Sequence, residues 1–205
     1  PDVLRFAVFS AGVGLAYISS LKFLPVAMAV TIFYTYPLLV ILISPRIDGI
    51  RLSPRRWIVA IAAFAGVMLA VGPHAEALDP RGVALALLGA LLCAGMFISG
   101  ARLTTDGMQT FFWSQMVAAP TALAFAWASG GLAPPEALLA AALPFAITAG
   151  GFFIGLLFQI LATSRLSAAS AALLFLIEPV VAIVAAAIAL GEHLTPAQAA
   201  GMLIV

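Results

Sequence analysis

The sequence contains one proline-interrupted segment twice, and we expect the second copy to cross a membrane in the opposite direction to the first. The first copy runs SLKFLPVAMAVTIFYTYP and the second TSRLSAASAALLFLIEP. In each copy a Phe stands four residues before a Pro, and a Ser/Thr-Pro step follows 17 residues later. Many secondary transporters contain an inverted repeat with an interrupted helix in each copy. The matching positions are Lys22, Phe33, Pro37 and Pro54 in the first copy, and Arg165, Phe175, Pro179 and Pro196 in the second.

The composition is that of an integral membrane protein. Apolar residues make up 64% of the chain and charged residues only 8%, with a mean hydropathy of +1.20. A soluble domain has about a quarter of its residues charged. The net charge of +1 gives no indication of nucleic-acid binding. The one cysteine, Cys93, lies in an apolar run and has no partner for an internal disulfide or a metal site. We therefore expect it to be a core residue, and no cofactor or metal is predicted.

Uncharged runs predict seven complete transmembrane helices and a partial eighth. A spanning helix needs about 20 apolar residues, and the last run covers little more than half of a ~30 Å hydrocarbon core. The first run begins almost at residue 1, which is Pro rather than Met, so the chain is expected to be an interior piece of a longer protein. The predicted spans are 6–21, 23–44, 57–73, 82–101, the interior of 107–133, 137–164 and 166–190, followed by the partial run 194–205.

The loops predict where these spans begin and end. Pro54 and Pro196 each follow a Ser or Thr that can cap a helix, so we expect helices to start there. The loop 72–82 contains Gly, Pro and acidic residues and joins two halves, which we place at 1–75 and 76–205.

The cations predict the orientation of the chain. Because loops alternate sides, seven cations fall on one side and two on the other, which together are the nine of the composition. The positive-inside rule places the larger group in the cytoplasm. The halves are offset by five spans, an odd number, so 23–44 and its partner 166–190 are predicted to run in opposite directions. The seven are Arg5, Arg46, Arg51, Arg55, Arg56, Arg102 and Arg165; the two are Lys22 and Arg81.

The second copy resembles the EamA-type repeat of the drug/metabolite transporter superfamily. The resemblance rests on a basic residue, a run of small residues, a central x-Pro and a Gly-Glu-x-Leu-Thr step before a closing helix, which here read SRLSAASAALLFLIEPVVAIVAAAIALGEHLTPAQAAGMLIV. The first copy resembles it less well, with Tyr36 in place of Glu178 and Ile50 in place of Glu192. The resemblance covers nearly the whole chain. It implies ten spans in two five-helix halves with cytoplasmic termini, of which this chain would be spans three to nine and the start of ten.

Transport or export of small metabolites or drugs by alternating access is what this resemblance implies. It does not imply a particular substrate. A multi-pass position in a bacterial plasma (inner) membrane follows from the same resemblance. The implied partners are the lipid bilayer and a small-molecule substrate, with possible proton coupling.

Glu178 is the one acidic or basic residue deep in a predicted span. A carboxylate at that depth costs about 2.5–3.5 kcal/mol on insertion scales, so it should face the bundle interior. Pro179 beside it lacks an N–H and leaves the carbonyl of Phe175 without its helical partner. One interpretation is a substrate or proton site where the kink opens a cavity, with Phe175 in its wall. The other is a protonated Glu that hydrogen-bonds a neighbouring helix.

Tyr34, Thr35 and Tyr36 stand before Pro37 at the matching place of the first copy. If both kinks border one cavity, it has a carboxylate on one side and hydroxyls and aromatic rings on the other. The alternative for each Tyr is packing with one interhelical hydrogen bond. A further candidate is Gln159, because a long amide in hydrocarbon needs a partner.

Gln159 belongs to a stripe of residues three or four apart on one helical face. Small residues at that spacing usually let helices approach closely, and this is the interpretation we favour for its glycines. The stripe consists of Thr148, Gly151, Gly155, Gln159 and Thr163.

Among function classes, the sequence favours a secondary transporter that exports or exchanges a neutral, zwitterionic or cationic metabolite, such as an amino acid or amine. An enzyme would need a nucleophile with a base or paired acids, and the remaining acids are scattered through loops and span ends. Two alternatives stay open: a non-transporting sensor or assembly partner, and a carrier of lipid-linked or sugar-nucleotide substrates. The latter would require several basic groups facing the cavity, and none is visible.

Overall fold

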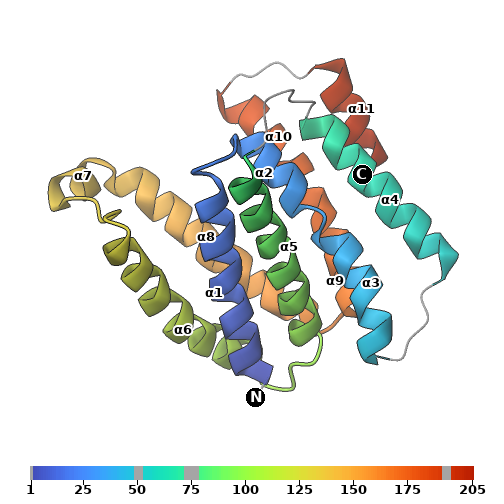
Figure 1. The fold of residues 1–205 in the computed structure, drawn as a ribbon, viewed down its shortest axis with the longest axis horizontal. Coiled ribbons are helices and arrows are strands. Elements are labelled where there is room, and N and C mark those ends of the chain that lie inside the picture. Colours follow the sequence, from blue (N-terminus) through green and yellow to red (C-terminus); the bar gives the residue numbers. More distant parts are fainter. Residues whose placement is uncertain (1, 49–52, 72–78, 191–194) are drawn as a thin grey trace.

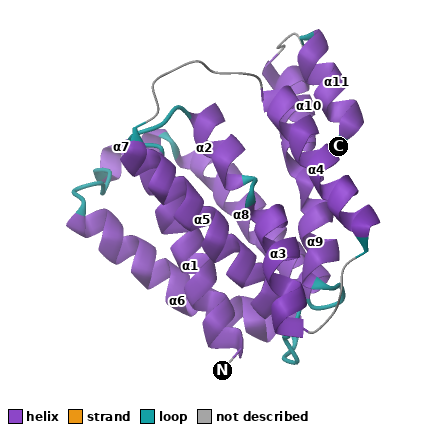
Figure 2. Ribbon diagram, turned by 45° about the vertical axis from the view of Figure 1, so that its right-hand side comes forward, coloured by secondary structure: helices purple, strands orange, loops and turns teal. Residues whose placement is uncertain are grey.

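The computed structural model describes residues 2–48, 53–71, 79–190 and 195–205, and these form helices joined by short loops (Figures 1 and 2). Arg51, His74, Glu192 and His193, together with most of the loop 72–82, lie outside the described residues. The helices are α1 (Asp2–Ser20), α2 (Val26–Phe33), α3 (Tyr36–Asp48), α4 (Pro54–Val71), α5 (Pro80–Gly100), α6 (Gly107–Ala128), α7 (Pro135–Ala140), α8 (Ala142–Thr163), α9 (Ala168–Leu174), the 3-10 turn η1 (Phe175–Ile177), α10 (Glu178–Leu190) and α11 (Pro196–Ile204).

Five segments among the described residues are long and apolar enough to cross a membrane. The expected span at 57–73 contains a shorter apolar helix, Trp57–Leu69, and α6 has the length but is not one of the five. The structure therefore supports a membrane bundle of helices, whereas the count of seven and a partial eighth stays a prediction. The five are Asp2–Ser20, Val26–Pro45, Pro80–Gly100, Ala142–Thr163 and Ala168–Ala185.

Both expected kinks are breaks between consecutive helices. Proline lacks the N–H that would bond to the carbonyl four residues earlier, so α2 ends at Phe33, just before Pro37. The Thr35 hydroxyl donates to the carbonyl oxygen of Ile32 at 2.7 Å and closes the turn. In the second copy the 3-10 turn Phe175–Ile177 separates α9 from α10. The two breaks therefore stand at matching places of the doubled segment.

The two broken helices run in opposite directions. In Figures 1 and 2, α2 and α10 lie toward one end of the bundle, and α3 and α9 toward the other. The chain passes from α2 to α3 and from α9 to α10. It therefore crosses the first break toward one end of the bundle and the second break toward the opposite end. This is the relationship that an inverted repeat requires.

The Ser/Thr-Pro steps start helices, as predicted. Helix α4 begins at Pro54 and α11 at Pro196. Thr195 and Gln198 form a capping box in which the Thr195 hydroxyl accepts from the Gln198 backbone N–H at 3.2 Å. Outside the spans, Asp79 caps α5, and the side-chain hydrogen bond from Arg81 holds the pKa of the Asp79 carboxyl below its ordinary value.

Helix α5 lies at the centre of the packing. It contacts α1 along its length and also touches α2, α3 and α9 (Figure 1). Helices α4 and α11 pack against each other at one side of the bundle. Their crossing is close: a Cβ built on Gly66 would stand 2.8 Å from the backbone carbonyl oxygen of Gly201. Glycine is required there because a larger residue would push the two helices apart.

Candidate functional site

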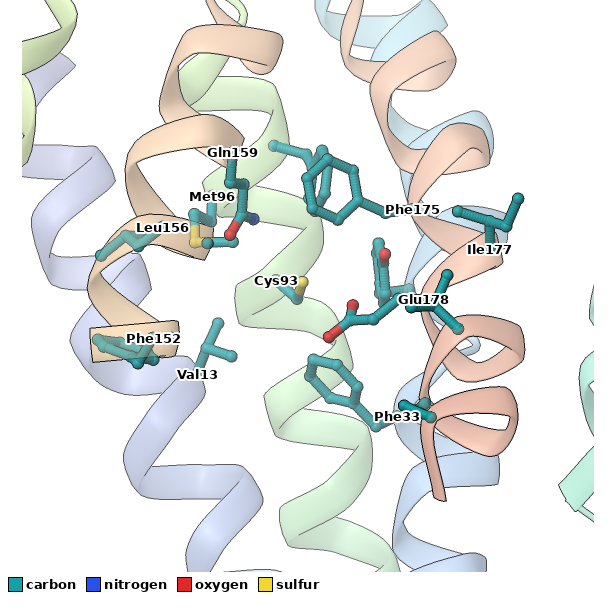
Figure 3. A pocket seen from close by; sticks show the side chains of 17 residues that line it. Val13, Phe33, Cys93, Met96, Phe152, Leu156, Gln159, Phe175, Ile177 and Glu178 are labelled. Atoms are coloured by element: carbon teal, nitrogen blue, oxygen red, sulfur yellow. The ribbon is translucent and has the colours of Figure 1, made fainter. Parts of the chain in front are cut away.

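A cavity of about 650 Å³ lies between α1, α5, α8 and the second broken helix (Figure 3). We call it the Gln159 cavity. Its walls are mostly apolar, and its polar side chains are those of Glu178, Gln159, Tyr36 and Cys93. Its lining includes Phe33, Tyr36, Cys93, Gly155, Gln159, Phe175 and Glu178.

Glu178 is placed by the helix break that the sequence indicated. It is the first residue of α10 and directly follows the 3-10 turn. Figure 3 shows its carboxylate pointing from the helix toward the space between Cys93 and Phe33. The residue is exposed, and because it lines two cavities its exposed surface faces them. The carboxylate is therefore available to a ligand.

Tyr34 is the polar partner of this carboxylate. Its hydroxyl lies close to the carboxyl group of Glu178 and interacts with it, so the break of the first copy adjoins that of the second. Tyr34 is itself buried, with 7% of its surface exposed. The Tyr17 hydroxyl and the Cys93 thiol also lie within electrostatic range of Glu178. All of these neighbours are ordinarily neutral at pH 7, so they leave the charge of the carboxylate uncompensated.

A ladder of aromatic rings extends from the carboxylate along the cavity wall. The rings of Phe33 and Tyr36 have their centroids 5.5 Å apart, and Tyr36 stacks on Phe97 at 5.2 Å. Phe97 meets Phe175 edge-on at 5.4 Å. Tyr36 and Phe97 are almost fully buried. The ladder gives the cavity a rigid apolar surface on which a ligand's apolar part can pack.

A second cavity, of about 780 Å³, opens on the other side of Glu178. We call it the Gln198 cavity. It is lined by Tyr17 from α1, by the exposed side of α2, by Tyr34 and by Gln198 of α11. Three residues line both cavities: Phe33, Glu178 and Ala182. The carboxylate and the Phe33 ring therefore stand at the boundary between the two spaces.

Charge is distributed unevenly around these cavities. Neither is lined by Lys, Arg or His within the described part of the chain. Glu178 is the acidic side chain in both linings. Such a site attracts a cation and offers an anion no compensating charge.

The structure brings most of the predicted site residues together. Tyr36, Gln159, Phe175 and Glu178 line the Gln159 cavity, and Tyr34 lines the Gln198 cavity. Thr35 lines neither of them, because its hydroxyl closes the turn against Ile32.

Several lining residues were missed from the sequence. Phe33 stands four residues before Pro37, the counterpart of Phe175, so the doubled spacing contained a signal for it. Cys93 and Phe97 had none, because α5 is apolar from Gly82 to Ile98 and its pattern does not mark the face that lines a cavity.

The glycines of the α8 stripe enlarge the cavity. We expected small residues there to allow close helix contact, but a Cβ built on Gly151 or Gly155 meets no atom within 4 Å. Both residues line the Gln159 cavity. Close contact does occur at the end of the stripe, where a Cβ on Gly100 would stand 2.8 Å from the Thr163 hydroxyl oxygen.

A comparison with known families decides what kind of protein carries this site. The sequence model of the EamA-like transporter family matches residues 1–72 and 80–205, nearly the whole chain. This chain belongs to the EamA-like transporter family. Its apolar helices and this membership make it a multi-pass membrane protein of a transporter family.

Named relatives of this EamA-like chain include threonine/homoserine exporters. The threonine/homoserine exporter RhtA of Escherichia coli K12 is 29% identical over 210 residues, and the match covers 96% of this chain. The RhtA proteins of E. coli O6:H1 and O157:H7 match to the same extent. The chain spans 65% of the length of these relatives. A solved crystal structure of another protein superposes with a TM-score of 0.78 at 22% identity, covering 98% of this chain and 75% of that one, and supports the fold.

Proposed function

We propose that this EamA-like chain is part of a secondary transporter that exports or exchanges a small neutral, zwitterionic or cationic metabolite, such as an amino acid or amine. The observation that carries the proposal is the Glu178 carboxylate, which faces a cavity of about 650 Å³ at a helix break. Membership of a transporter family and similarity to threonine/homoserine exporters support it.

In the proposed mechanism Glu178 binds the cargo's ammonium group, or a proton in its place. A carboxylate inside a membrane bundle needs such a partner, and the lining within the described residues supplies no cationic side chain. The apolar part of the cargo packs on the rings of Phe33, Tyr36 and Phe175, and the Gln159 amide hydrogen-bonds a polar group of the cargo. Neutralising the site then permits the two halves to rock about their helix breaks.

The proposed architecture has two inverted halves, 1–75 and 76–205, in a bacterial inner membrane. The opposite directions of the two broken helices support this arrangement (Figure 1). The ends of the bundle next to Arg5, Arg102 and Arg165 would face the cytoplasm, since the positive-inside rule assigns the larger group of cations to that side.

An export assay with the full chain tests the proposal. Cells that lack their own exporters would be loaded with single compounds: threonine, homoserine, an aromatic amino acid or a primary amine. Cells that produce the full chain should release at least one of these faster than cells with an empty vector. Cells that produce an equal amount of the Glu178→Gln variant should release it more slowly, or at a rate that no longer varies with pH. If release rises and Glu178→Gln leaves both its rate and its pH dependence unchanged, or if no compound is released faster, the proposal is wrong.

A further inference from the structure

We propose that the Gln198 cavity is a second binding subsite, selective for ammonium groups, which shares the Glu178 carboxylate with the Gln159 cavity. The inference rests on the proposed function, in which Glu178 is the carboxylate that binds the cargo. It adds a separate place where the cargo's cation is held before or after it occupies the Gln159 cavity.

The chemistry of the Gln198 cavity fits an ammonium group. The rings of Tyr17 and Phe33 have centroids 5.1 Å apart, and those of Phe33 and Tyr34 are 5.8 Å apart. All three residues line this cavity together with the Glu178 carboxylate. A cation over an aromatic face gains about 0.5–2 kcal/mol, and it also gains the attraction of the carboxylate. The described lining holds no basic side chain that would repel it.

The Gln198 amide adds a donor at the edge of this subsite. Its oxygen accepts from the Thr195 backbone N–H at 2.9 Å and from the Thr195 hydroxyl at 3.1 Å. Because these bonds fix the oxygen toward Thr195, the amide N–H₂ group is turned away from it. It can donate to a hydroxyl or carboxylate oxygen of a bound molecule. The subsite thus provides for an ammonium group and a nearby oxygen, the two groups that choline and many amino compounds contain.

The residues that line the two cavities show that the subsites are distinct. Tyr17, Tyr34 and Gln198 line the Gln198 cavity alone, and Cys93, Phe97 and Gln159 line the Gln159 cavity alone. The boundary consists of Phe33, Glu178 and Ala182. A cation can therefore stay beside one carboxylate while its aromatic surroundings change from the Tyr17 side to the Phe97 side.

Choline binding to the purified full chain tests the subsite, with 3,3-dimethyl-1-butanol as the neutral molecule of the same shape. Calorimetry should show binding of choline and at least about tenfold weaker binding of the alcohol. Tyr17→Leu removes a ring and should weaken choline binding about three- to thirtyfold, the range that a cation–aromatic contact predicts. Tyr17→Phe keeps the ring and should bind within about twofold of the unmodified protein.

A second variant tests the subsite independently, in case Tyr17→Leu does not fold. Ala27 lines the Gln198 cavity alone, so Ala27→Leu should fill the subsite and reduce choline binding without removing any polar group. Thermal unfolding of each variant reports whether it is folded. Equal choline affinity in the unmodified protein and in folded Tyr17→Leu or Ala27→Leu would overturn the subsite, as would no choline binding at all. If Glu178→Gln still abolishes export in that case, the proposed function survives without the subsite.

Discussion

The Tyr34 hydroxyl lies beside the Glu178 carboxyl group and interacts with it, and this contact joins the break of one broken helix to the break of the other. The two residues are 144 positions apart in the chain and belong to the two copies of the doubled segment. A neutral hydroxyl partners the carboxylate without cancelling its charge. Under the proposed function, this leaves the carboxylate able to bind a cation or a proton.

The contact between Tyr34 and Glu178 should appear as an energetic coupling. A hydrogen bond to a charged group contributes about 1.5–3 kcal/mol. In a double-mutant cycle on the full chain, Tyr34→Phe and Glu178→Ala should therefore show a coupling of about 1–3 kcal/mol in the free energy of unfolding. Reversible unfolding in mixed micelles supplies the four values. Additivity within about 0.3 kcal/mol would show that the two side chains do not interact.

Filling the cavity at α8 should block bulky cargo without harming the fold. A Cβ on Gly155 meets nothing within 4 Å, and the residue lines the Gln159 cavity. Gly155→Leu should lower export of an aromatic amine at least about tenfold while the melting temperature stays within a few degrees. Gly150→Leu is the matched control, since Gly150 is also free of neighbours but does not line the cavity. Equal export by both variants would place the cargo elsewhere.

The crossing of α4 and α11 should not tolerate a side chain at Gly66. The nearest atom to a Cβ there is the Gly201 backbone oxygen, which cannot move aside as a flexible side chain can. Overpacking of this kind costs about 1–3 kcal/mol, so Gly66→Val should lower the free energy of unfolding by that amount. Gly14→Val is the comparison, because a Cβ at Gly14 meets no atom within 4 Å. A smaller loss in Gly66→Val than in Gly14→Val would refute the close crossing.

The orientation can be measured with cysteines placed at the two ends of the bundle. Lys22→Cys should react with an impermeant maleimide added to intact cells, and Arg165→Cys should react only after the cells are opened. Both variants are made in a Cys93→Ala background so that the native thiol gives no signal. The expected pattern follows from the positive-inside rule. The reverse pattern would place the larger group of cations outside.

The positions of the prolines made part of this structure predictable. Pro37 and Pro179 indicated the two breaks, and Pro54 and Pro196 the first residues of α4 and α11, because a missing N–H has the same local effect in any surroundings. The doubled spacing put Tyr34 and Glu178 beside the matching breaks, and the structure brings the two residues together. These inferences depend on backbone chemistry and repetition, which the sequence states directly.

The sequence does not indicate which face of an apolar helix lines a cavity and which face packs against another helix. The spacing of Gly151 and Gly155 is the same whether the glycines pack against a neighbouring helix or line a cavity. We expected them to pack against a helix. Cys93 and Phe97 lie in a helix without a polar face, so no pattern marked them as cavity residues. That distinction depends on the arrangement of several helices, which periodicity along one helix does not contain.

The most direct test of the central claim is the pH dependence of transport by the Glu178→Gln variant of the full chain. The protein would be reconstituted in vesicles, and uptake of the exported compound would be followed between pH 5.5 and 8.5, with Glu178→Ala and the melting temperatures of all forms measured alongside. We predict that Glu178→Gln folds as the unmodified protein does but loses transport, or transports at a rate that no longer varies with pH. Transport by Glu178→Gln with an unchanged pH profile, together with a Glu178→Ala variant that does not fold, would show that Glu178 is structural and contradict the mechanism.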